Sequence, residues 1–369
     1  MDGPERAAMR WALELAERGW GRVAPNPMVG AVVVRDGHVV GEGWHAEYGG
    51  PHAEVVALNR AGPAARGATL VVTLEPCAHH GRTPPCTDAI IAAGIARVVF
   101  ACADPNRAAA GGAERLLDAG IAVARDIEGE AARALNASFF HAHEAARPFV
   151  ALKLALSLDA RLSDQPDAPA VVTGPAARAY AHRLRAGYDA VVVGIGTALA
   201  DDPLLTVRDA AAPRVPPRRV VLDSRARLPE KARLVRTAHD SPVWHFHTAA
   251  APGQAVAALA ERGVRTRAVA GGPAGVAWNG VLEALAEDGA DAVLVEGGGR
   301  VAASLLAEDR VQRMHLFYAP HLYGQHGAAG FPGTAFPAGW RLVDVRRLEG
   351  DVLLTLDRAP DGSGREGKG

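Results

Sequence analysis

Four residues in the first third of the sequence have the side chains that a hydrolytic metal site requires. His52 and Glu54 stand two residues apart in the stretch PHAEVVAL, and Cys77 and Cys86 flank the stretch AHHGRTPP. Residues two apart in the middle of a helix point to nearly opposite sides, so His52 and Glu54 can address one point only at a helix N-terminus, where Pro51 leads in. One histidine and two cysteines offer three ligands to Zn²⁺ and leave the fourth tetrahedral position open, which is typical of catalytic zinc.

An open coordination position predicts that the zinc ion binds and activates a water molecule. Zinc lowers the pKa of a bound water to about 7, and a carboxylate that is not a ligand can take the proton and pass it to a leaving amine. We expect Glu54 to have that role. A histidine or a cysteine taken alone is more often a packed core residue, and this is what we expect of Cys102. His45 is expected in a surface or loop position, just before the site, where it can touch the substrate.

Alternating helices and strands are expected to position these residues. Ala8, Trp11, Ala12 and Leu15 share one helical face, and two β-rich runs follow that are joined by a hairpin turn at 36–37. The pattern predicts an α/β layer sandwich in which Cys77 closes a strand and Cys86 opens a helix. The later elements are a helix from about residue 52, a strand within 68–77, a helix within 86–94, a strand within 96–102 and a helix within 113–120.

The length of 369 residues exceeds what one hydrophobic core usually supports, which indicates two domains. The sequence pattern changes near residue 146, where Arg147-Pro148 precedes a continuous apolar strand. We therefore expect a first domain over 1–146 and a second α/β domain over 147–358. The residues 359–369 are rich in glycine and charge, and we expect them to be disordered.

Charge and composition exclude several classes of protein. The chain has 40 Lys+Arg against 41 Asp+Glu, a net charge of -1, which gives no general attraction to nucleic acid. We find neither a signal peptide nor an apolar run of about 18 residues. Three cysteines are too few for a disulfide framework and suit a reducing compartment. These features predict a cytoplasmic protein that binds neither nucleic acid nor membrane.

The first domain resembles a known enzyme family. HAEVVAL with LEPCAHHGRTPPC, preceded by PNPMVGAVVV and followed by ACADPN, resembles the deaminase half of the bifunctional riboflavin biosynthesis family. The resemblance implies a cytidine-deaminase-like α/β/α fold and hydrolytic removal of the 2-amino group from 2,5-diamino-6-(5-phosphoribosylamino)pyrimidin-4-one, a small-molecule substrate. In this family His52, Cys77 and Cys86 would bind Zn²⁺ and Glu54 would shuttle protons. Substrate contacts are expected from Asn26, whose amide suits the pyrimidine edge, and from His79, His80 and Arg82, whose charge suits a phosphate.

The second domain resembles the reductase half of the same family over about 148–357. The matching text is KLALSLDARL, HRLRAGYDAVVVGIGTALADDPLLTVR, RVVLDS and VEGGGRVAASLL. The resemblance implies a fold similar to dihydrofolate reductase, with NADPH supplying hydride to open the ribosyl group to ribityl. Independently, the strand, glycine turn and helix in VLVEGGGRVAASLL would direct backbone N–H groups to a phosphate. The residues implied are Lys153, Arg185, Arg208 and Glu296 for the substrate, and Thr197, Asp201, Ser224, Gly297, Gly298 and Gly299 for NADPH.

The second domain also departs from its family pattern. Ala160 stands where the family usually has glycine, and a positive φ there would cost alanine on the order of 1 kcal/mol. Pro169 and Val171 replace the usual serine and tryptophan, which should weaken binding. An alternative is therefore a deaminase whose C-terminal domain has lost reductase activity. A nucleic-acid base deaminase is a third hypothesis, which the near-neutral charge disfavours. We also expect a homo-oligomer.

Overall fold

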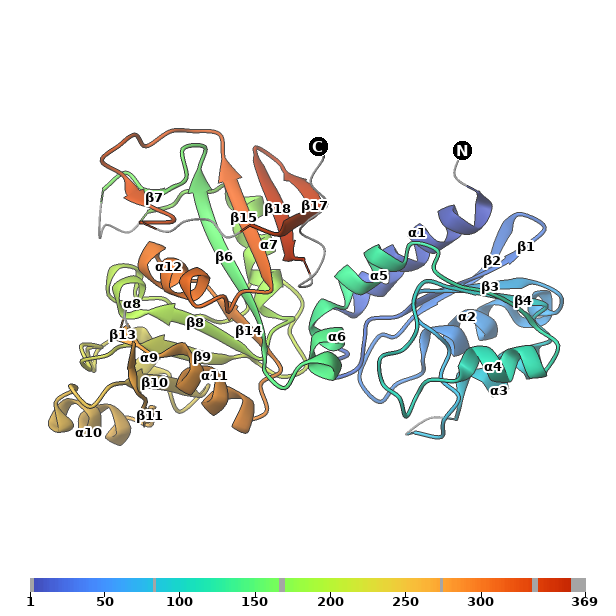
Figure 1. The fold of residues 1–369 in the computed structure, drawn as a ribbon, viewed down its shortest axis with the longest axis horizontal. Helices are drawn as coiled ribbons and strands as arrows, with labels where there is room; N and C mark the ends of the chain where they lie inside the picture. The colour runs from blue at the N-terminus through green and yellow to red at the C-terminus, as the bar shows by residue number, and fades with distance from the viewer. Residues whose placement is uncertain (1–2, 82–83, 166–169, 273–274, 334–337, 360–369) are drawn as a thin grey trace, which may run out of the picture. The chain divides into compact units, whose positions relative to one another are not determined.

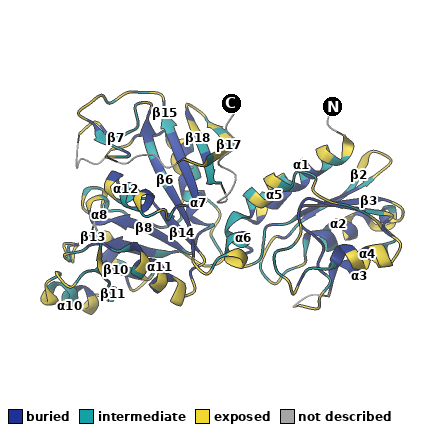
Figure 2. Cartoon of the chain, in the orientation of Figure 1, coloured by how far each residue is buried: buried dark blue, intermediate teal, exposed yellow. Residues whose placement is uncertain are grey.

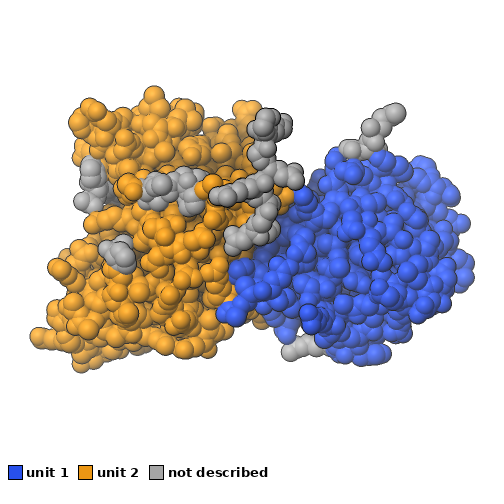
Figure 3. Space-filling view, in the orientation of Figure 1, with its two compact units in different colours: residues 1–146 blue, residues 147–369 orange. Residues whose placement is uncertain are grey.

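The structure is a computed structural model that describes residues 3–81, 84–165, 170–272, 275–333 and 338–359. It divides into two compact units, 1–146 and 147–369, which Figure 3 shows in different colours. The expected disordered tail at 359–369 lies outside the described residues except for Ala359. Among the helices of the described residues, none is both long enough and apolar enough to cross a membrane.

The first unit is built on a five-stranded sheet with the strand order β2-β1-β3-β4-β5. β1 pairs antiparallel with β2 and β3, whereas β3, β4 and β5 run parallel. The turn between β1 and β2 lies at Asp36 and Gly37, which both have positive φ, as the sequence predicts. The strands are β1 (Gly30–Arg35), β2 (His38–Trp44), β3 (Thr69–Val72), β4 (Arg97–Phe100) and β5 (Ala122–Ala124).

Helices cover both faces of this sheet and produce three layers (Figure 1). Side chains alternate between the faces of a strand, so Leu70 packs with α2, α3 and α4, while Val71 packs with α1, α5 and α6. The most buried residues lie where the helices pack against the two faces of the sheet (Figure 2). The helices are α1 (Pro4–Ala16), α2 (Ala53–Ala61), α3 (Cys86–Ala93), α4 (Gly112–Asp118), α5 (Gly129–Leu135) and α6 (Ala137–Glu144), with short 3-10 turns η1 (Glu17–Gly19) and η2 (Gly62–Ala65).

Strand β3 is shorter than the sequence predicts. It ends at Val72, and the expectation that Cys77 closes this strand is wrong. Beyond Val72, Thr73 still bonds Gly30 of β1, donating through its backbone N and accepting through Oγ1, and Glu75 N donates to Cys102 O. Pro76 has no N–H to continue a ladder. Cys77 therefore lies in the loop between β3 and α3.

Two glycines bring α2 unusually close to β2. A Cβ at Gly43 would lie 2.5 Å from the carbonyl oxygen of Ala53, and a Cβ at Gly41 would lie 2.3 Å from that of Ala57. Any larger residue would push the helix away from the sheet. The absence of side chains on this face of β2 thus fixes the position of the N-terminus of α2.

The second unit contains a nine-stranded sheet with the order β11-β10-β9-β8-β14-β6-β15-β18-β17. The strands from β11 to β15 run parallel, and β18 and β17 continue the sheet antiparallel at one edge. The strands of this sheet are β6 (Phe149–Ser157), β8 (Ala190–Gly194), β9 (Arg218–Leu222), β10 (Val243–His247), β11 (Arg265–Ala268), β14 (Ala292–Val295), β15 (Arg313–Ala319), β17 (Trp340–Leu348) and β18 (Asp351–Arg358). Short pairs form between β7 (Arg161–Ser163) and β16 (Ala328–Ala329), and between β12 (Gly271–Gly272) and β13 (Gly275–Val276).

Helices pack on both faces of the large sheet. Val192 contributes to the core under α11 and α12, whereas Val191 and Val193 contribute to the core under α8, α9 and α10. The helices that follow the neighbouring strands β8 and β14 thus lie on opposite faces, which is the arrangement at which open α/β sheets bind ligands beyond the carboxyl ends of their strands. The helices are α7 (Pro175–Arg185), α8 (Ile195–Asp201), α9 (Arg233–Arg236), α10 (Gly253–Glu261), α11 (Trp278–Glu287) and α12 (Gly299–Ala307).

Candidate active sites

The start of α2 places His52 and Glu54 at the same end of the first sheet. His52 is the N-cap residue of α2, with extended backbone (φ -72°, ψ 159°), and Glu54 lies in the first turn. The change from extended to helical backbone between them lets both side chains turn to one point, which residues two apart in a helix cannot do. Glu54 is buried, and burial raises the pKa of its carboxyl.

The two cysteines reach the same point from the loop after β3 and from the start of α3. Cys86 is the first residue of α3, as the sequence predicts, and its backbone N–H donates a hydrogen bond to Cys77 Sγ at 3.3 Å. Hydrogen bonds from the Cys86 thiol and from His52 lower the pKa of Cys77 to about 4. Cys77 is therefore ready to act as a thiolate, the form in which cysteine binds metals.

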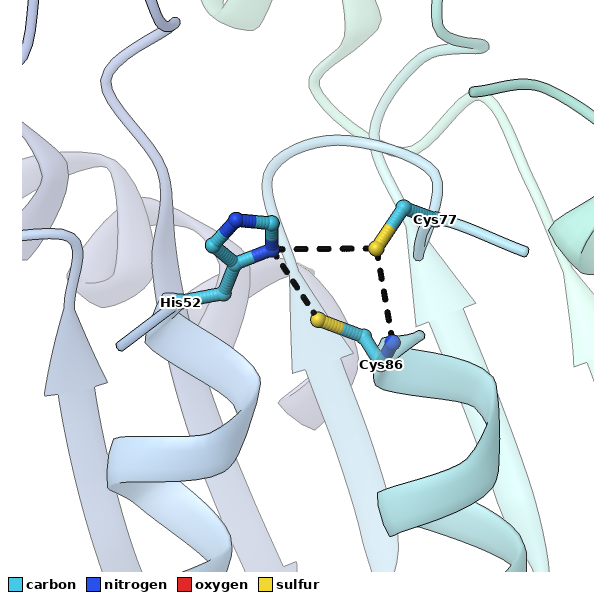
Figure 4. A group of neighbouring side chains, drawn as sticks. All are labelled: His52, Cys77 and Cys86. Carbon is cyan, nitrogen blue, oxygen red and sulfur yellow. Dashed lines mark hydrogen bonds between the residues drawn. The ribbon is translucent and has the colours of Figure 1, made fainter. Parts of the chain in front are cut away.

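His52, Cys77 and Cys86 form a three-ligand cluster, shown in Figure 4. His52 Nδ1 lies 3.2 Å from Cys86 Sγ and 3.7 Å from Cys77 Sγ, and all three ligand atoms lie within 4.8 Å of one another. Tetrahedral Zn²⁺ with ordinary bond lengths holds nitrogen and sulfur ligands about 3.6 Å apart. The donor types and their spacing therefore fit zinc.

A pocket of about 250 Å³ lies beside this cluster, and Asn26, His45, His52, Glu54 and His79 contribute to its wall. His45 lies in the loop after β2, which is one of its two expected positions, but its side chain is almost fully buried and does not lie at the surface. His45 Nδ1 donates to the carbonyl oxygen of Pro51 at 3.0 Å, and burial lowers the pKa of the imidazole.

The amide of Asn26 is oriented by this neutral histidine. His45 Nε2 carries no proton when Nδ1 donates, so Nε2 accepts the hydrogen bond from Asn26 Nδ2 at 3.2 Å. Of the other residues expected to contact substrate, His79 and His80 are both exposed, and His79 is the one that lines the pocket. Arg82 lies outside the described residues.

In the second unit, Lys153, Arg185 and Glu296 meet beyond the carboxyl end of β14. Arg185 Nε and Nη2 donate to the two carboxylate oxygens of Glu296 at 2.6 and 3.0 Å, and Lys153 Nζ lies 4.0 Å from Glu296 Oε2. Burial opposes ionisation of Glu296, but the charges of Arg185 and Lys153 lower the pKa of its carboxyl to about 2. Asp201 also interacts electrostatically with Lys153, so the cluster holds Lys153 and Arg185 against Glu296 and Asp201.

The residues expected along NADPH follow the carboxyl ends of neighbouring strands in the large sheet. Thr197 and Asp201 belong to α8, and Gly297, Gly298 and Gly299 join β14 to α12. A Cβ at Gly298 would lie 3.7 Å from Thr197 Oγ1, so the segments that follow β8 and β14 adjoin. Ser224 follows β9, the strand next to β8. Arg208 is different, because its side chain is exposed and its backbone oxygen accepts a hydrogen bond from His182 Nδ1.

Two protein families match the chain. The family described as the RibD C-terminal domain matches residues 148–354, and the cytidine and deoxycytidylate deaminase zinc-binding region matches residues 4–102. The riboflavin biosynthesis protein RibD of Aquifex aeolicus is 42% identical over 354 residues, which cover 95% of this chain and 97% of that protein. The chain belongs to the RibD family.

Other members of the RibD family, and two solved structures, are similar to this chain over both of its units. RibD of Escherichia coli is 37% identical over 374 residues, covering 94% of this chain and 98% of that protein. The crystal structure of a diaminohydroxyphosphoribosylaminopyrimidine deaminase/5-amino-6-(5-phosphoribosylamino)uracil reductase from Thermotoga maritima, 36% identical, covers 96% of this chain and 99% of that chain, with a TM-score of 0.77. RibD of Acinetobacter baumannii, 37% identical and with the same coverage, gives 0.76.

Membership of the RibD family confirms the predicted fold class and activity. The chain is a bifunctional enzyme of riboflavin biosynthesis, with a cytidine-deaminase-like zinc-binding domain followed by an α/β reductase domain. The comparisons give no support to the alternative in which the C-terminal domain has lost reductase activity, because the RibD C-terminal domain matches from 148 to 354.

The departures from the RibD pattern lie in the sequence between β6 and α7. Ala160 has a φ of +56°, the left-handed conformation in which alanine is strained. Its carbonyl oxygen accepts a hydrogen bond from Gly330 N at 2.9 Å, so a glycine-like conformation is retained without a glycine. Val171 is 75% exposed, whereas Val172 and Thr173 are buried. Pro169 lies outside the described residues.

Sequence reasoning missed several residues of the deaminase pocket. Asp104 and Asn106 line it from the ACADPN stretch, which contributes to the family resemblance. Tyr48 precedes the metal motif, and Phe139 comes from α6. No spacing rule connects Phe139 to the metal motif, and only the tertiary fold brings it to the pocket.

Proposed function

We propose that His52, Cys77 and Cys86 hold the zinc ion of the deaminase and that Glu54 transfers the proton. The observation that carries this proposal is the convergence of one imidazole and two sulfur atoms beside a buried carboxylate. Zinc in such a site supplies the Lewis acidity that brings the pKa of water near 7. Burial keeps Glu54 basic, which suits a group that takes a proton from water and gives it to the leaving amine.

We propose that the deaminase substrate is 2,5-diamino-6-(5-phosphoribosylamino)pyrimidin-4-one. The fixed amide of Asn26 supports recognition of a pyrimidine edge, because its nitrogen already bonds His45 and its oxygen remains for a donor on the ring. His79 at the pocket wall, together with Arg82, would meet the phosphate of the ribosyl arm.

The reductase is proposed to receive the deaminated product and convert its ribosyl group to ribityl. Lys153, Arg185 and Arg208 would bind the phosphosugar, and Glu296 would hold the two buried cations in place. The cationic side chains of Lys153, Arg185 and Arg208 support an anionic substrate. NADPH, which supplies the hydride, would lie along Thr197, Asp201, Ser224 and the turn formed by Gly297, Gly298 and Gly299, where α12 begins.

We further propose that the deaminase occupies 1–146, that the reductase occupies 147–358, and that the enzyme is a cytoplasmic homo-oligomer. The last point is supported by the edge of the large sheet. β17 is an edge strand, and Leu342 and Val345 on it and Val352 on β18 are exposed apolar side chains. An exposed edge of this kind is a common site of self-association. A native mass equal to one chain would contradict this assembly.

The proposed function is tested with the purified full chain and the diaminopyrimidinone substrate. Released ammonia reports deamination, and loss of NADPH absorbance reports reduction. Both signals are expected, with the NADPH signal dependent on prior deamination. Ammonia without NADPH oxidation would contradict the reductase assignment, and NADPH oxidation without ammonia would contradict the proposed order of the two steps.

A further inference from the structure

The reductase domain contains a fully buried Asp–His pair that the reaction does not use. Asp223 follows β9 and His245 lies in the middle of β10, and neither side chain is exposed to solvent. His245 Nε2 lies 3.2 Å from Asp223 Oδ2, and the same oxygen accepts a hydrogen bond from Leu228 N at 2.9 Å. Burying two ionisable groups is costly unless they serve each other, so the pair needs an explanation.

The hydrogen bonds define one state of this pair. A carboxylate can only accept from Nε2, so Nε2 of His245 carries the proton. Within the described part of the chain, His245 Nδ1 has no hydrogen-bond partner. His245 thus donates through Nε2 to an ionised Asp223. Burial opposes this ionisation, but the hydrogen bonds from His245 and Leu228 lower the pKa of Asp223.

The pair organises the segment Ser224–Arg227 that follows β9. Leu228 N is tied to the Asp223 carboxylate, and Ala226 N donates to Asp223 O at 3.2 Å. Ala226 has a φ of +50°, so the segment makes a tight turn whose two ends are both held by Asp223. Thr248 secures the segment from the next strand, because its backbone N and its Oγ1 both donate to Ser224 O.

This turn carries positive charge at the carboxyl end of β9, beside the proposed NADPH position. The side chains of Arg225 and Arg227 are exposed, and Arg227 Nε lies 3.9 Å from Asp223 Oδ1. Within the described residues, Arg225 has no ion-pair partner. A carboxylate at this place would favour the 2′-hydroxyl of NADH, whereas arginine favours the 2′-phosphate of NADPH. The carboxylate of Asp223 is bonded to His245 and is buried, so the charged groups that this turn exposes to solvent are Arg225 and Arg227.

We propose that Asp223 and His245 are positioning residues that hold the Ser224–Arg227 turn so that Arg225 binds the 2′-phosphate of NADPH. This inference rests on the proposed placement of NADPH beside Ser224 and extends it to the choice between the two dinucleotides. The buried Asp223–His245 pair fixes the shape of the turn, and the exposed Arg225 binds the phosphate. Neither His245 nor Asp223 touches the cofactor.

The test is the dissociation constant of each dinucleotide, measured by fluorescence titration of the full-length protein without substrate. Arg225→Met removes the charge from an exposed position and should weaken NADPH binding about tenfold with little change for NADH. His245→Leu removes the donor to Asp223 and should reduce the preference for NADPH to a similar extent. His245→Gln keeps an N–H donor and should retain most of the preference.

Tyr188→Phe is the matched control. It removes a buried hydrogen bond to His315 in the same domain, but Tyr188 precedes β8 at the opposite end of the sheet from the turn. Its NADPH preference should equal that of the wild type, even if its melting temperature falls. If wild-type protein binds NADPH and both Arg225→Met and His245→Leu keep the full preference, the positioning role is wrong. If wild-type protein binds neither dinucleotide, the proposed reductase function fails with it.

Discussion

Arg185 and Glu296 lie 111 residues apart in the sequence and form a two-point ion pair at the reductase cluster. Arg185 comes from the last turn of α7 and Glu296 from the carboxyl end of β14. Arg185 Nη1 also donates to the carbonyl oxygen of Thr206 at 2.9 Å, which ties the segment after α8 to the same centre. The guanidinium of Arg185 therefore joins three segments of the second domain.

Glu296→Gln should destabilise the second domain. The amide cannot neutralise Arg185 or Lys153, and the buried guanidinium of Arg185 would lose the carboxylate that it bonds at two points. Removing one partner of a buried ion pair costs about 3–5 kcal/mol. Denaturant unfolding should show this loss, while zinc content and deamination stay unchanged. An unfolding free energy equal to that of the wild type would show that the ion pair does not stabilise the domain.

The stability difference between the wild type and Glu296→Gln should depend on pH. The pKa of Glu296 is lowered from 4.5 to about 2 on folding, so its contribution to stability is full above pH 4.5 and is lost as the pH falls toward 2. This difference corresponds to about 3 kcal/mol. Unfolding free energies of wild type and Glu296→Gln should therefore differ at pH 6 and converge as the pH approaches 2. A difference that persists unchanged to pH 2 would contradict the lowered pKa.

Cys86→Ser should lower the zinc content of the purified protein, because a serine hydroxyl is a poor substitute for a thiolate ligand. Cys102→Ser is the matched control. Cys102 is also buried, but burial raises the pKa of its thiol to about 12, and its Sγ lies 3.6 Å from the carbonyl oxygen of Thr73, away from the ligand cluster. Elemental analysis should find full zinc in Cys102→Ser alone, and equal zinc in both variants would remove Cys86 from the ligand set.

Glu54→Gln should retain zinc and lose deamination by about 10²–10⁴-fold, the range for removal of a general acid–base group. The amide has nearly the same shape but cannot carry the proton. Glu14→Gln, on the exposed face of α1, is the control and should release ammonia at the wild-type rate. Deamination by Glu54→Gln at more than a tenth of the wild-type rate would mean that another group moves the proton.

The local features of the deaminase site could be predicted from the sequence, whereas its long-range contacts could not. Short motifs carry their own geometry: α2 begins directly after His52, and Cys86 opens α3, because prolines precede both residues. By contrast, Asn136 bonds both backbone groups of Met28 across 108 residues. That contact and the Asp223–His245 pair depend on which strands and helices become neighbours, and no local pattern encodes this.

The close contact between α2 and β2 predicts that Gly43→Ala will disturb the metal site from a distance. The added methyl group would meet the carbonyl oxygen of Ala53 and move the start of α2, which carries His52. Overpacking of this kind costs about 1–3 kcal/mol. We expect a lower unfolding free energy and weaker zinc retention against a chelator. Gly3→Ala, where the new Cβ meets nothing within 4 Å, should change neither quantity much.

Ala160→Gly is expected to stabilise the second domain. Ala160 has a φ of +56°, which glycine adopts without the strain that a Cβ causes, and relief of this strain is worth up to about 1 kcal/mol after the entropy cost of glycine. Ala257→Gly, at an exposed position within α10, should have the opposite sign and destabilise by about 1 kcal/mol. Thermal unfolding of the two variants should therefore shift in opposite directions. If both variants melt below the wild type, the left-handed conformation at Ala160 carries no strain.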